Sequence, residues 1–251
     1  MENQLQEMLK ALKLGGILDN LDVRNKEAIQ RHLSYLDFLN LLIHDELERR
    51  KQNKLAMRLR KASCDPTKTL ESFDFSFNPA INKKEIFDLA TCRFIEEKAH
   101  VWLLGPTGVG KSHLAQALAT EACRKDIDAL FITVSKMLAY IRGGRSDGTY
   151  TARIRRFTQP QLLVLDEFAL KPLEPPGPDD LYEVISERHE KDPIIITSNR
   201  AREEWPEVLG DPLLASAIID RLAYGARQIE ITGPSYRTKG KTKSPTKKKE
   251  K

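Results

Sequence analysis

Residues 105–112, GPTGVGKS, have the spacing of a phosphate-binding loop, G-x-x-x-x-G-K-[ST]. The apolar stretch VWLL at 101–104 precedes them and a helical pattern follows from Lys111, which is the context that such a loop requires. Glycines allow backbone N–H groups to face the phosphates, Lys111 bridges the phosphates, and Ser112 ligates Mg²⁺. We therefore predict an ATP site contacted by Gly105, Pro106, Thr107, Gly108, Val109, Gly110, Lys111, Ser112 and His113.

A second group of polar residues ends two apolar stretches further along the chain. LLVLDE places Asp166 and Glu167 at the carboxyl end of a buried strand, where ligands bind in parallel sheets. We expect Asp166 to hold Mg²⁺ through water and Glu167 to act as general base towards the attacking water. PIIITSN places Asn199 where it can sense the γ-phosphate, with Ser198 as the competing candidate. A helix cap or surface turn is the alternative role for the acidic pair, and a turn is the alternative for Asn199.

These motifs exclude some nucleotide-dependent proteins. A GTPase needs a guanine-binding N-K-x-D element, and SNRAREE at 198–204 is not one. A small-molecule kinase transfers phosphate to an acceptor other than water and does not need a hydrolytic Asp-Glu pair. The pattern favours ATP hydrolysis coupled to conformational change, with Lys111, Glu167 and Asn199 as catalytic residues.

The rest of the chain predicts two kinds of domain. Residues 1–61 have helical periodicity, interrupted at Gly15-Gly16, and the later part predicts a longer helix in a small bundle. Its main apolar stripe is Ile29, Leu33, Leu36, Ile43 and Leu47.

Residues 63–79 combine turn residues with three phenylalanines and predict a linker that packs onto the following domain. Beyond them, short apolar stretches alternate with helical patterns, which predicts an α/β fold with a mostly parallel five-stranded sheet. The expected strands are 101–104, 129–134, 161–167, 193–199 and 228–231. We expect a helical N-terminal domain at 1–65, an ATPase domain at 66–236, and a disordered basic tail at 237–251.

The net charge of +5 is concentrated in that tail, where eight Lys/Arg and one Glu give +7 and leave −2 for the other residues. A polyanion partner and a solubilising extension are both consistent with such a tail. The three cysteines are widely spaced and fit a reducing compartment. Without an apolar run long enough for a membrane span or a secretion signal, we predict a cytoplasmic protein with no membrane partner.

A basic segment follows the helical stripe. RRKQNKLAMRLRK at 49–61 contains seven Lys/Arg and no acid. A continuous basic helix suits contacts to a phosphate backbone, although a solvated charged face has the same composition. The candidate DNA contacts here are Arg49, Arg50, Lys51, Lys54 and Arg58.

Several stretches together resemble the IstB-like AAA+ ATPases, the helper proteins of insertion sequences, which are related to DnaC-type helicase loaders. The resemblance covers about residues 1–237, including the N-terminal helical block that distinguishes the transposition helpers from the loaders. The matching stretches are GPTGVGKSHLA, LLVLDE, YEVISERHEKDPIIITSN, AIIDRL, GPSYR, SYLDFLNLLIHDELERRKQNK and KTLESFDF.

This resemblance implies ATP sites between subunits of a ring or helical filament, with an arginine from the neighbour at the γ-phosphate. The matching position is Arg221, and Arg188 ranks second. An ion pair with Asp220 or Glu230 is the alternative role for Arg221. About twenty residues follow Ile231, so we expect the usual helical lid to be missing, with Arg237 as a weak substitute for its sensor arginine.

The resemblance also implies a helical insertion that faces nucleic acid between the second strand and Asp166. Residues 140–159 contain five arginines and one acid, and a mobile surface loop is the alternative. Binding here should be steeply salt-dependent and weakly sequence-specific. The candidate contacts are Arg142, Arg145, Arg153, Arg155 and Arg156.

Taken together, these features predict an ATPase that polymerises on double-stranded DNA, marks a target for a cognate transposase, and is released by hydrolysis. A helicase loader that prefers single strands is one alternative, although Tyr140, Tyr150 and Phe157 are too scattered to indicate a stacking platform. A nucleotide-gated scaffold with negligible turnover is another, and a P-loop kinase is a distant one.

Overall fold

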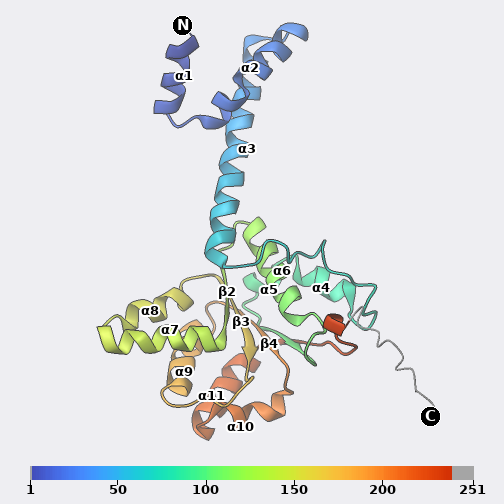
Figure 1. Cartoon of the computed structure of the whole chain (residues 1–251), viewed down its shortest axis with the longest axis vertical. Helices are drawn as coiled ribbons and strands as arrows, with labels where there is room; N and C mark the ends of the chain where they lie inside the picture. Colours follow the sequence, from blue (N-terminus) through green and yellow to red (C-terminus); the bar gives the residue numbers. More distant parts are fainter. Residues whose placement is uncertain (1, 239–251) are drawn as a thin grey trace, which may run out of the picture. The chain divides into compact units, whose positions relative to one another are not determined.

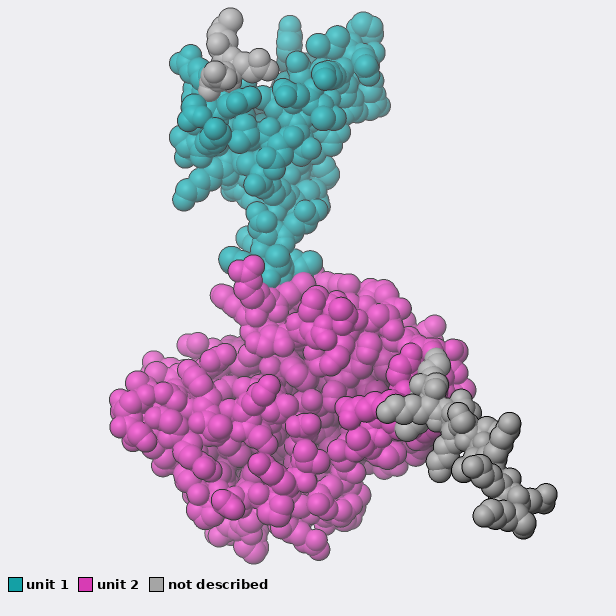
Figure 2. All heavy atoms as spheres, viewed as in Figure 1, with its two compact units in different colours: residues 1–58 teal, residues 59–251 magenta. Residues whose placement is uncertain are grey.

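The computed structural model of the chain describes residues 2–238. It contains two compact units, residues 1–58 and residues 59–251, shown separately in Figure 2. The boundary between the two units falls within a helix, after residue 58, whereas the sequence pattern predicts the domain boundary at residue 65 in the linker. The predicted basic tail lies outside the described residues from position 239 onward. No helix among residues 2–238 is both long and apolar enough to cross a bilayer.

Three helices form the first unit (Figure 1): α1 at Glu2–Ala11, α2 at Gly15–Gln30 and α3 at Tyr35–Ala62. The prediction of one longer helix carrying Ile29 and Leu47 was wrong, because the chain turns between these residues. His32 adopts a left-handed backbone conformation with φ of 50°. Ser34 then accepts a hydrogen bond from the backbone N–H of Asp37 at 3.2 Å, which starts a new helix.

Much of the apolar stripe predicted for a small bundle is exposed in this unit. Leu36, Ile43 and Leu47 on α3 are 73%, 44% and 52% exposed, whereas Leu9 and Leu42 are buried. Three helices of this size leave much apolar surface uncovered.

The glycine pair that interrupts the helical pattern has a packing role where α2 meets α3. A Cβ on Gly16 would lie 2.6 Å from the Cα of Glu46, so only glycine permits this approach. The Glu46 carboxylate, 7% exposed, accepts a hydrogen bond from the Gly16 N–H at 2.6 Å. The Gly15-Gly16 pair therefore interrupts the helical pattern of the sequence and also allows α2 and α3 to pack closely.

The second unit is built on a five-stranded parallel sheet with the order β2-β3-β4-β1-β5. Its strands lie within two residues of the predicted bounds, and β1 to β4 do so because each is a short apolar run between turn residues. The strands are β1 at Val101–Leu104, β2 at Ala129–Thr133, β3 at Leu162–Phe168, β4 at Ile194–Ser198 and β5 at Arg227–Glu230.

Helices cover both faces of this sheet. α6 at Lys111–Arg124 packs across strands β1 to β4 on one face. The other face forms a large apolar cluster with five further helices, in which Trp102, Phe168 and Trp205 are buried. These helices are α7 at Val134–Asp147, α8 at Tyr150–Thr158, α9 at Gly177–Arg188, α10 at Trp205–Leu209 and α11 at Pro212–Ala223.

Shorter elements complete the unit. α4 at Lys83–Leu89 and α5 at Arg93–Glu96 precede β1, and two 3-10 turns lie at Arg202–Glu204 and Tyr236–Thr238. In the described chain, the segment after β5 contains only the second of these turns.

The strand order places the predicted site residues together. β4 lies between β3 and β1, and Ser198 pairs with Leu104 on one side and with Phe168 on the other. The carboxyl ends of these three parallel strands therefore meet at one edge of the sheet, where ligands bind in such folds.

Candidate nucleotide-binding site

The loop between β1 and α6 is held closely by the end of the chain. Gly108 has a φ of 87°, and a Cβ there would lie 2.0 Å from the hydroxyl oxygen of Ser235. The carbonyl of Gly108 also accepts a hydrogen bond from the backbone N–H of Tyr236 at 2.9 Å. Glycine is therefore required at this position both by backbone conformation and by close approach.

Lys111 is buried at the start of α6. Its ammonium donates to the carbonyls of Gly105 at 2.6 Å and Pro106 at 2.8 Å within the loop. Burial lowers its pKa to about 8, partly offset by Asp166 and reinforced by the nearby positive charge of Arg237. A phosphate group would supply the negative charge that this ammonium lacks.

The two predicted acids approach this loop from β3. Asp166 is 6% exposed, and its Oδ1 accepts a hydrogen bond from the Ser112 hydroxyl at 2.7 Å. Glu167 is exposed and lies at the border of the same cavity. Hydroxyl and carboxylate oxygens are ligands that Mg²⁺ prefers, so Ser112 and Asp166 suit a magnesium ion beside the phosphates.

Lys111, Ser112 and Glu167 line a cavity of about 380 Å³, which is within the usual range for small-ligand sites, and Asp166 lies behind it, bonded to Ser112. The phosphate loop, the tips of β3 and β4, the linker and the end of the chain all contribute to its walls. The lining residues are Lys68, Ser72, Phe73, Asp74, Phe77, Asn78, Thr107, Gly108, Val109, Gly110, Lys111, Ser112, His113, Glu167, Thr197, Asn199, Tyr236 and Arg237.

The linker forms an aromatic wall of this cavity. The rings of Phe77 and Tyr236 meet edge to face with their centroids 4.9 Å apart. Phe73 packs in the same way against His113 at 5.1 Å, and the His113 Nε2 lies 2.9 Å from the carbonyl oxygen of Thr69. Such a wall suits the flat face of a nucleotide base. The phenylalanines between turn residues indicated packing onto the domain, but nothing in their spacing indicated a ligand.

The end of the described chain closes the cavity on the side of the loop. After β5, the Ile231 N–H donates to the carbonyl of Leu104 at 2.7 Å, and Asn78 donates from its side chain to the carbonyl of Thr232 at 2.6 Å. This course brings Arg237 to the cavity. The structure therefore places beside Lys111 the arginine that the sequence offered only as a substitute for a lid residue.

The tip of β4 separates the two candidates for the γ-phosphate sensor. Asn199 is exposed and lines the cavity. Ser198 is fully buried on the other face, where its hydroxyl donates to the carbonyl of Phe168 at 2.9 Å. Thr197 also lines the cavity, although sequence reasoning did not single it out. Its position inside an apolar run gave no sign of this.

The two predicted trans-acting arginines have different surroundings. Arg221 is half-buried on α11, away from the cavity lining, and contacts Tyr182 and the carbonyl of Ala217 rather than an acid. Arg188 is 1% exposed. Its ranking as a second candidate was wrong, because a residue enclosed in its own subunit cannot reach a neighbour. Its guanidinium instead donates to backbone carbonyls inside the domain.

The insertion at 140–159 forms the helical pair α7 and α8 instead of a loop. Arg145 pairs with the buried Asp180 at 2.5 Å, and Arg153 pairs with Asp147 at 2.6 Å. Arg145 therefore ties the insertion to α9, and Arg153 joins α8 to the end of α7.

The other three arginines of the insertion are exposed. Arg142 and Arg155 have no acidic partner in residues 2–238, and Arg156 only stacks on Tyr140 at 4.8 Å. The helices α7 and α8 of the unit that contains the nucleotide cavity thus carry three exposed guanidinium groups without an acidic partner among residues 2–238.

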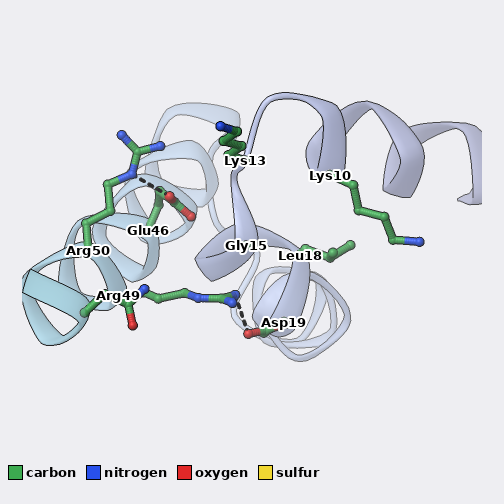
Figure 3. A pocket seen from close by; sticks show the side chains of 9 residues that line it. Lys10, Lys13, Gly15, Leu18, Asp19, Glu46, Arg49 and Arg50 are labelled. Atoms are coloured by element: carbon green, nitrogen blue, oxygen red, sulfur yellow. Dashed lines mark hydrogen bonds and ion pairs between the residues drawn. The ribbon is translucent and has the colours of Figure 1, made fainter. Parts of the chain in front are cut away.

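The basic segment of α3 is largely paired within its own unit. Figure 3 shows Arg49 directed towards Asp19, at 2.5 Å, and Arg50 towards Glu46, at 2.7 Å. Lys51 pairs with Glu48 at 2.7 Å. The pairs of Arg49 and Lys51 are exposed and therefore weak, so these two cations stay accessible to a stronger anion, whereas Arg50 pairs with a buried carboxylate. Of the remaining candidates, Lys54 and Arg58 lie further along the same helix, with Lys54 exposed and Arg58 half-buried.

Comparisons with known proteins agree with this geometry. The family of IstB-like ATP binding proteins matches residues 7–244. An insertion-sequence ATP-binding protein of Mycobacterium tuberculosis is 41% identical over 93% of this chain and 93% of its own. AMPPCP-bound DnaA from Aquifex aeolicus has a TM-score of 0.57 at 18% identity, covering 67% of this chain and 51% of that one.

DnaI has a TM-score of 0.56 at 24% identity, covering 70% of this chain and 98% of that one. Both structures share the AAA+ P-loop fold, which here holds a phosphate loop, an Asp-Glu pair and a polar strand tip around one cavity. The chain belongs to the IstB-like ATP-binding proteins, the AAA+ ATPases associated with insertion sequences.

Proposed function

We propose that this protein binds ATP and Mg²⁺, assembles on double-stranded DNA, and presents that DNA to a cognate transposase until hydrolysis releases the assembly. The observation that carries this proposal is that Arg142, Arg155 and Arg156, on the helical insertion of the unit with the nucleotide cavity, are exposed and have no acidic partner within residues 2–238. Guanidinium groups without acidic partners favour the binding of a polyanion. Because they lie on the ATPase unit, the bound nucleotide can control that binding.

At the nucleotide, each residue has a separate proposed role. Lys111 holds the phosphates, while Ser112 and Asp166 hold Mg²⁺, which offsets phosphate charge when it is bound. Glu167 accepts a proton from the attacking water, and Asn199 orients that water against the γ-phosphate. Arg237 adds a positive charge from the same chain, because it lines the cavity beside Lys111.

In an assembly of several copies, a neighbouring subunit supplies a further positive charge at the γ-phosphate. Arg221 stands half-exposed outside the cavity of its own chain, so it is free to serve the cavity of a neighbour. Such an arginine can raise the rate of phosphoryl transfer by several orders of magnitude. The exposed stripe of Leu36, Ile43 and Leu47 offers surface for contact with a second copy or with the transposase.

DNA contacts should be cumulative. Each protomer would contribute Arg142, Arg155 and Arg156, and linked protomers gain affinity because each later contact forms within one complex. The pairing of Arg145 and Arg153 inside the domain gives them a supporting role in this surface. The α3 cations Arg49, Arg50, Lys51, Lys54 and Arg58 form a second proposed contact region.

The deciding experiment measures binding of labelled duplex and single-stranded oligonucleotides with ATP, with ADP and without nucleotide. It compares the wild type with Glu167→Gln and with a variant in which all three surface arginines are alanine. Lys84→Ala on α4, an exposed lysine outside both proposed DNA surfaces, is the matched control. ATP should strengthen duplex binding, Glu167→Gln should stay bound, and the triple variant should lose both affinity and salt dependence.

Other outcomes select the alternatives. Preference for single strands would favour the loader function. Duplex binding that ignores nucleotide would contradict the gating step. Equal ATP turnover by Glu167→Gln and wild type would contradict the role of Glu167.

A further inference from the structure

The acidic pair of β3 lies on a β-bulge. Two residues of β3, Asp166 and Glu167, lie opposite a single residue of β4, Thr197, where the strand register shifts. On a regular strand, adjacent side chains point to opposite faces of the sheet. The bulge instead lets Asp166 reach Ser112 while Glu167 borders the same cavity. The site therefore depends on this irregularity.

Thr197 contacts both residues of the bulge. Its hydroxyl donates to the Oδ1 of Asp166 and accepts the backbone N–H of Glu167 at 3.2 Å. The side chain is 2% exposed, so water cannot readily replace either bond. A single hydroxyl thus links the side chain of the first acid to the backbone of the second.

Glu167 needs such support because its backbone is unfavourable for a side chain of this kind. Its φ is 58°, in the left-handed region that residues other than glycine rarely adopt. Conformations of this sort persist where the surrounding structure holds them, and they are concentrated at functional sites. The bond from the Glu167 N–H to Thr197 is such a constraint.

The neighbouring hydroxyl and amide cannot replace Thr197. Ser198 is directed to the opposite face, where it contacts the carbonyl of Phe168 and the indole of Trp205. Asn199 is exposed at the cavity and is available to the nucleotide. The three consecutive polar residues therefore have different surroundings: Thr197 contacts the acids, Ser198 lies on the opposite face, and Asn199 is exposed at the cavity.

We infer that Thr197 is a positioning residue for ATP hydrolysis. It holds the bulge in the conformation that directs Glu167 to the attacking water and fixes the Asp166 carboxylate beside Ser112. In this role it acts through the two acids that it contacts. The inference rests on the proposed function of Glu167 as the base.

Thr197→Val tests this directly, because valine keeps the shape of threonine and the preference for a strand while removing both hydrogen bonds. We expect kcat for ATP to fall about 10- to 100-fold, the effect of misplacing a catalytic group by a fraction of an ångström to an ångström. KM and the affinity for Mg²⁺-ATP should stay near wild type. Thr197→Ser restores the hydroxyl and should recover most of the rate.

Several results would overturn the inference. These are wild-type turnover by Thr197→Val, a Thr197→Ser variant as slow as the valine variant, or equal losses of kcat, nucleotide affinity and thermal stability. If Thr197→Val does not fold, Thr197→Ala takes its place under the same criteria. Glu167→Gln separates the two proposals, because wild-type turnover by that variant refutes the base itself, whatever Thr197 does.

Discussion

The buried guanidinium of Arg188 gives a prediction that separates a structural arginine from a catalytic one. Its two terminal nitrogens donate to four backbone carbonyls, those of Phe157, Pro160, Gln161 and Pro193, at 2.7 to 3.3 Å. Burial lowers the pKa of this guanidinium to about 10, so its hydrogen bonds must compensate for lost hydration. We expect Arg188→Lys to destabilise the domain while leaving the nucleotide site intact.

The magnitude follows from the donor geometry. Each terminal nitrogen of Arg188 serves two carbonyls, whereas lysine has a single nitrogen that can serve about one such pair. The carbonyl of Pro193 also accepts the backbone N–H of Leu163 at 3.4 Å, so the loss falls on the other three carbonyls; two of them without a partner cost about 1–3 kcal/mol each, which gives a loss of about 4 kcal/mol in unfolding free energy. For a domain of this size, that corresponds to a fall in Tm of about 8–16 °C.

The assay is thermal unfolding followed by circular dichroism, together with ATP binding and turnover per folded molecule. Arg221→Lys is the matched control, because Arg221 donates to only one backbone carbonyl and one tyrosine hydroxyl and is half-exposed. We expect Arg221→Lys to keep its Tm within about 2–4 °C of wild type, the equivalent of about 1 kcal/mol, and to lose turnover in the assembled state. The reasoning is refuted by an Arg188→Lys variant with wild-type Tm and lost turnover, which would make Arg188 a catalytic arginine.

Three further perturbations test other parts of the structure. Burial lowers the pKa of Lys111 to about 8, and bound phosphates would raise it, so ATP binding should take up a proton at pH 9 but little at pH 7. Calorimetry in buffers of different ionisation enthalpy measures this proton uptake. Equal uptake at both pH values would contradict the prediction. Burial, with nearby positive charges, lowers the pKa of His100 from 6.5 to about 4 in the folded protein. As the pH falls from 6.5 to 4, the unfolded chain therefore binds a proton that the folded chain does not, and up to about 3 kcal/mol of unfolding free energy is lost. His100→Asn, which retains an acceptor for the Ile194 N–H, should reduce that loss in denaturant titrations, and an unchanged pH profile would assign the loss to other groups. Gly16→Ala should lower hydrogen-exchange protection in α2 and α3 but not in α6, because its Cβ would collide with the backbone of Glu46; unchanged protection would show that the two helices can separate without cost.

Much of the nucleotide site was predictable from local sequence. Loops with this spacing bind phosphate through their own backbone, so the glycines of 105–112 and Lys111 are identifiable without knowledge of distant contacts. The three central strands were predictable for a similar reason, because β1, β3 and β4 are buried almost throughout and appear as short apolar runs. Asp166 and Asn199 follow from the general rule that ligands bind at the carboxyl ends of such strands.

Other features depend on pairings between distant segments. The aromatic wall needs Phe77 beside Tyr236, and the placement of Arg237 needs the end of the chain to bond Gly108. Neither pairing leaves a periodic signal in the sequence. The division of arginines into buried, paired and free groups is also tertiary, because composition reports charge but not the partner of each charge.

The sequence by itself determined that this chain is a P-loop ATPase with a parallel sheet, since a local loop and apolar runs specify both. Only the tertiary structure showed that Thr197, and not Ser198, is the hydroxyl of β4 that faces the acids. It also showed that a bulge of one residue on β3 changes the face to which Glu167 points. Only the tertiary structure showed Arg188 enclosed and Arg142 exposed. The physical reason is that burial and register arise from packing between segments, which no single segment encodes.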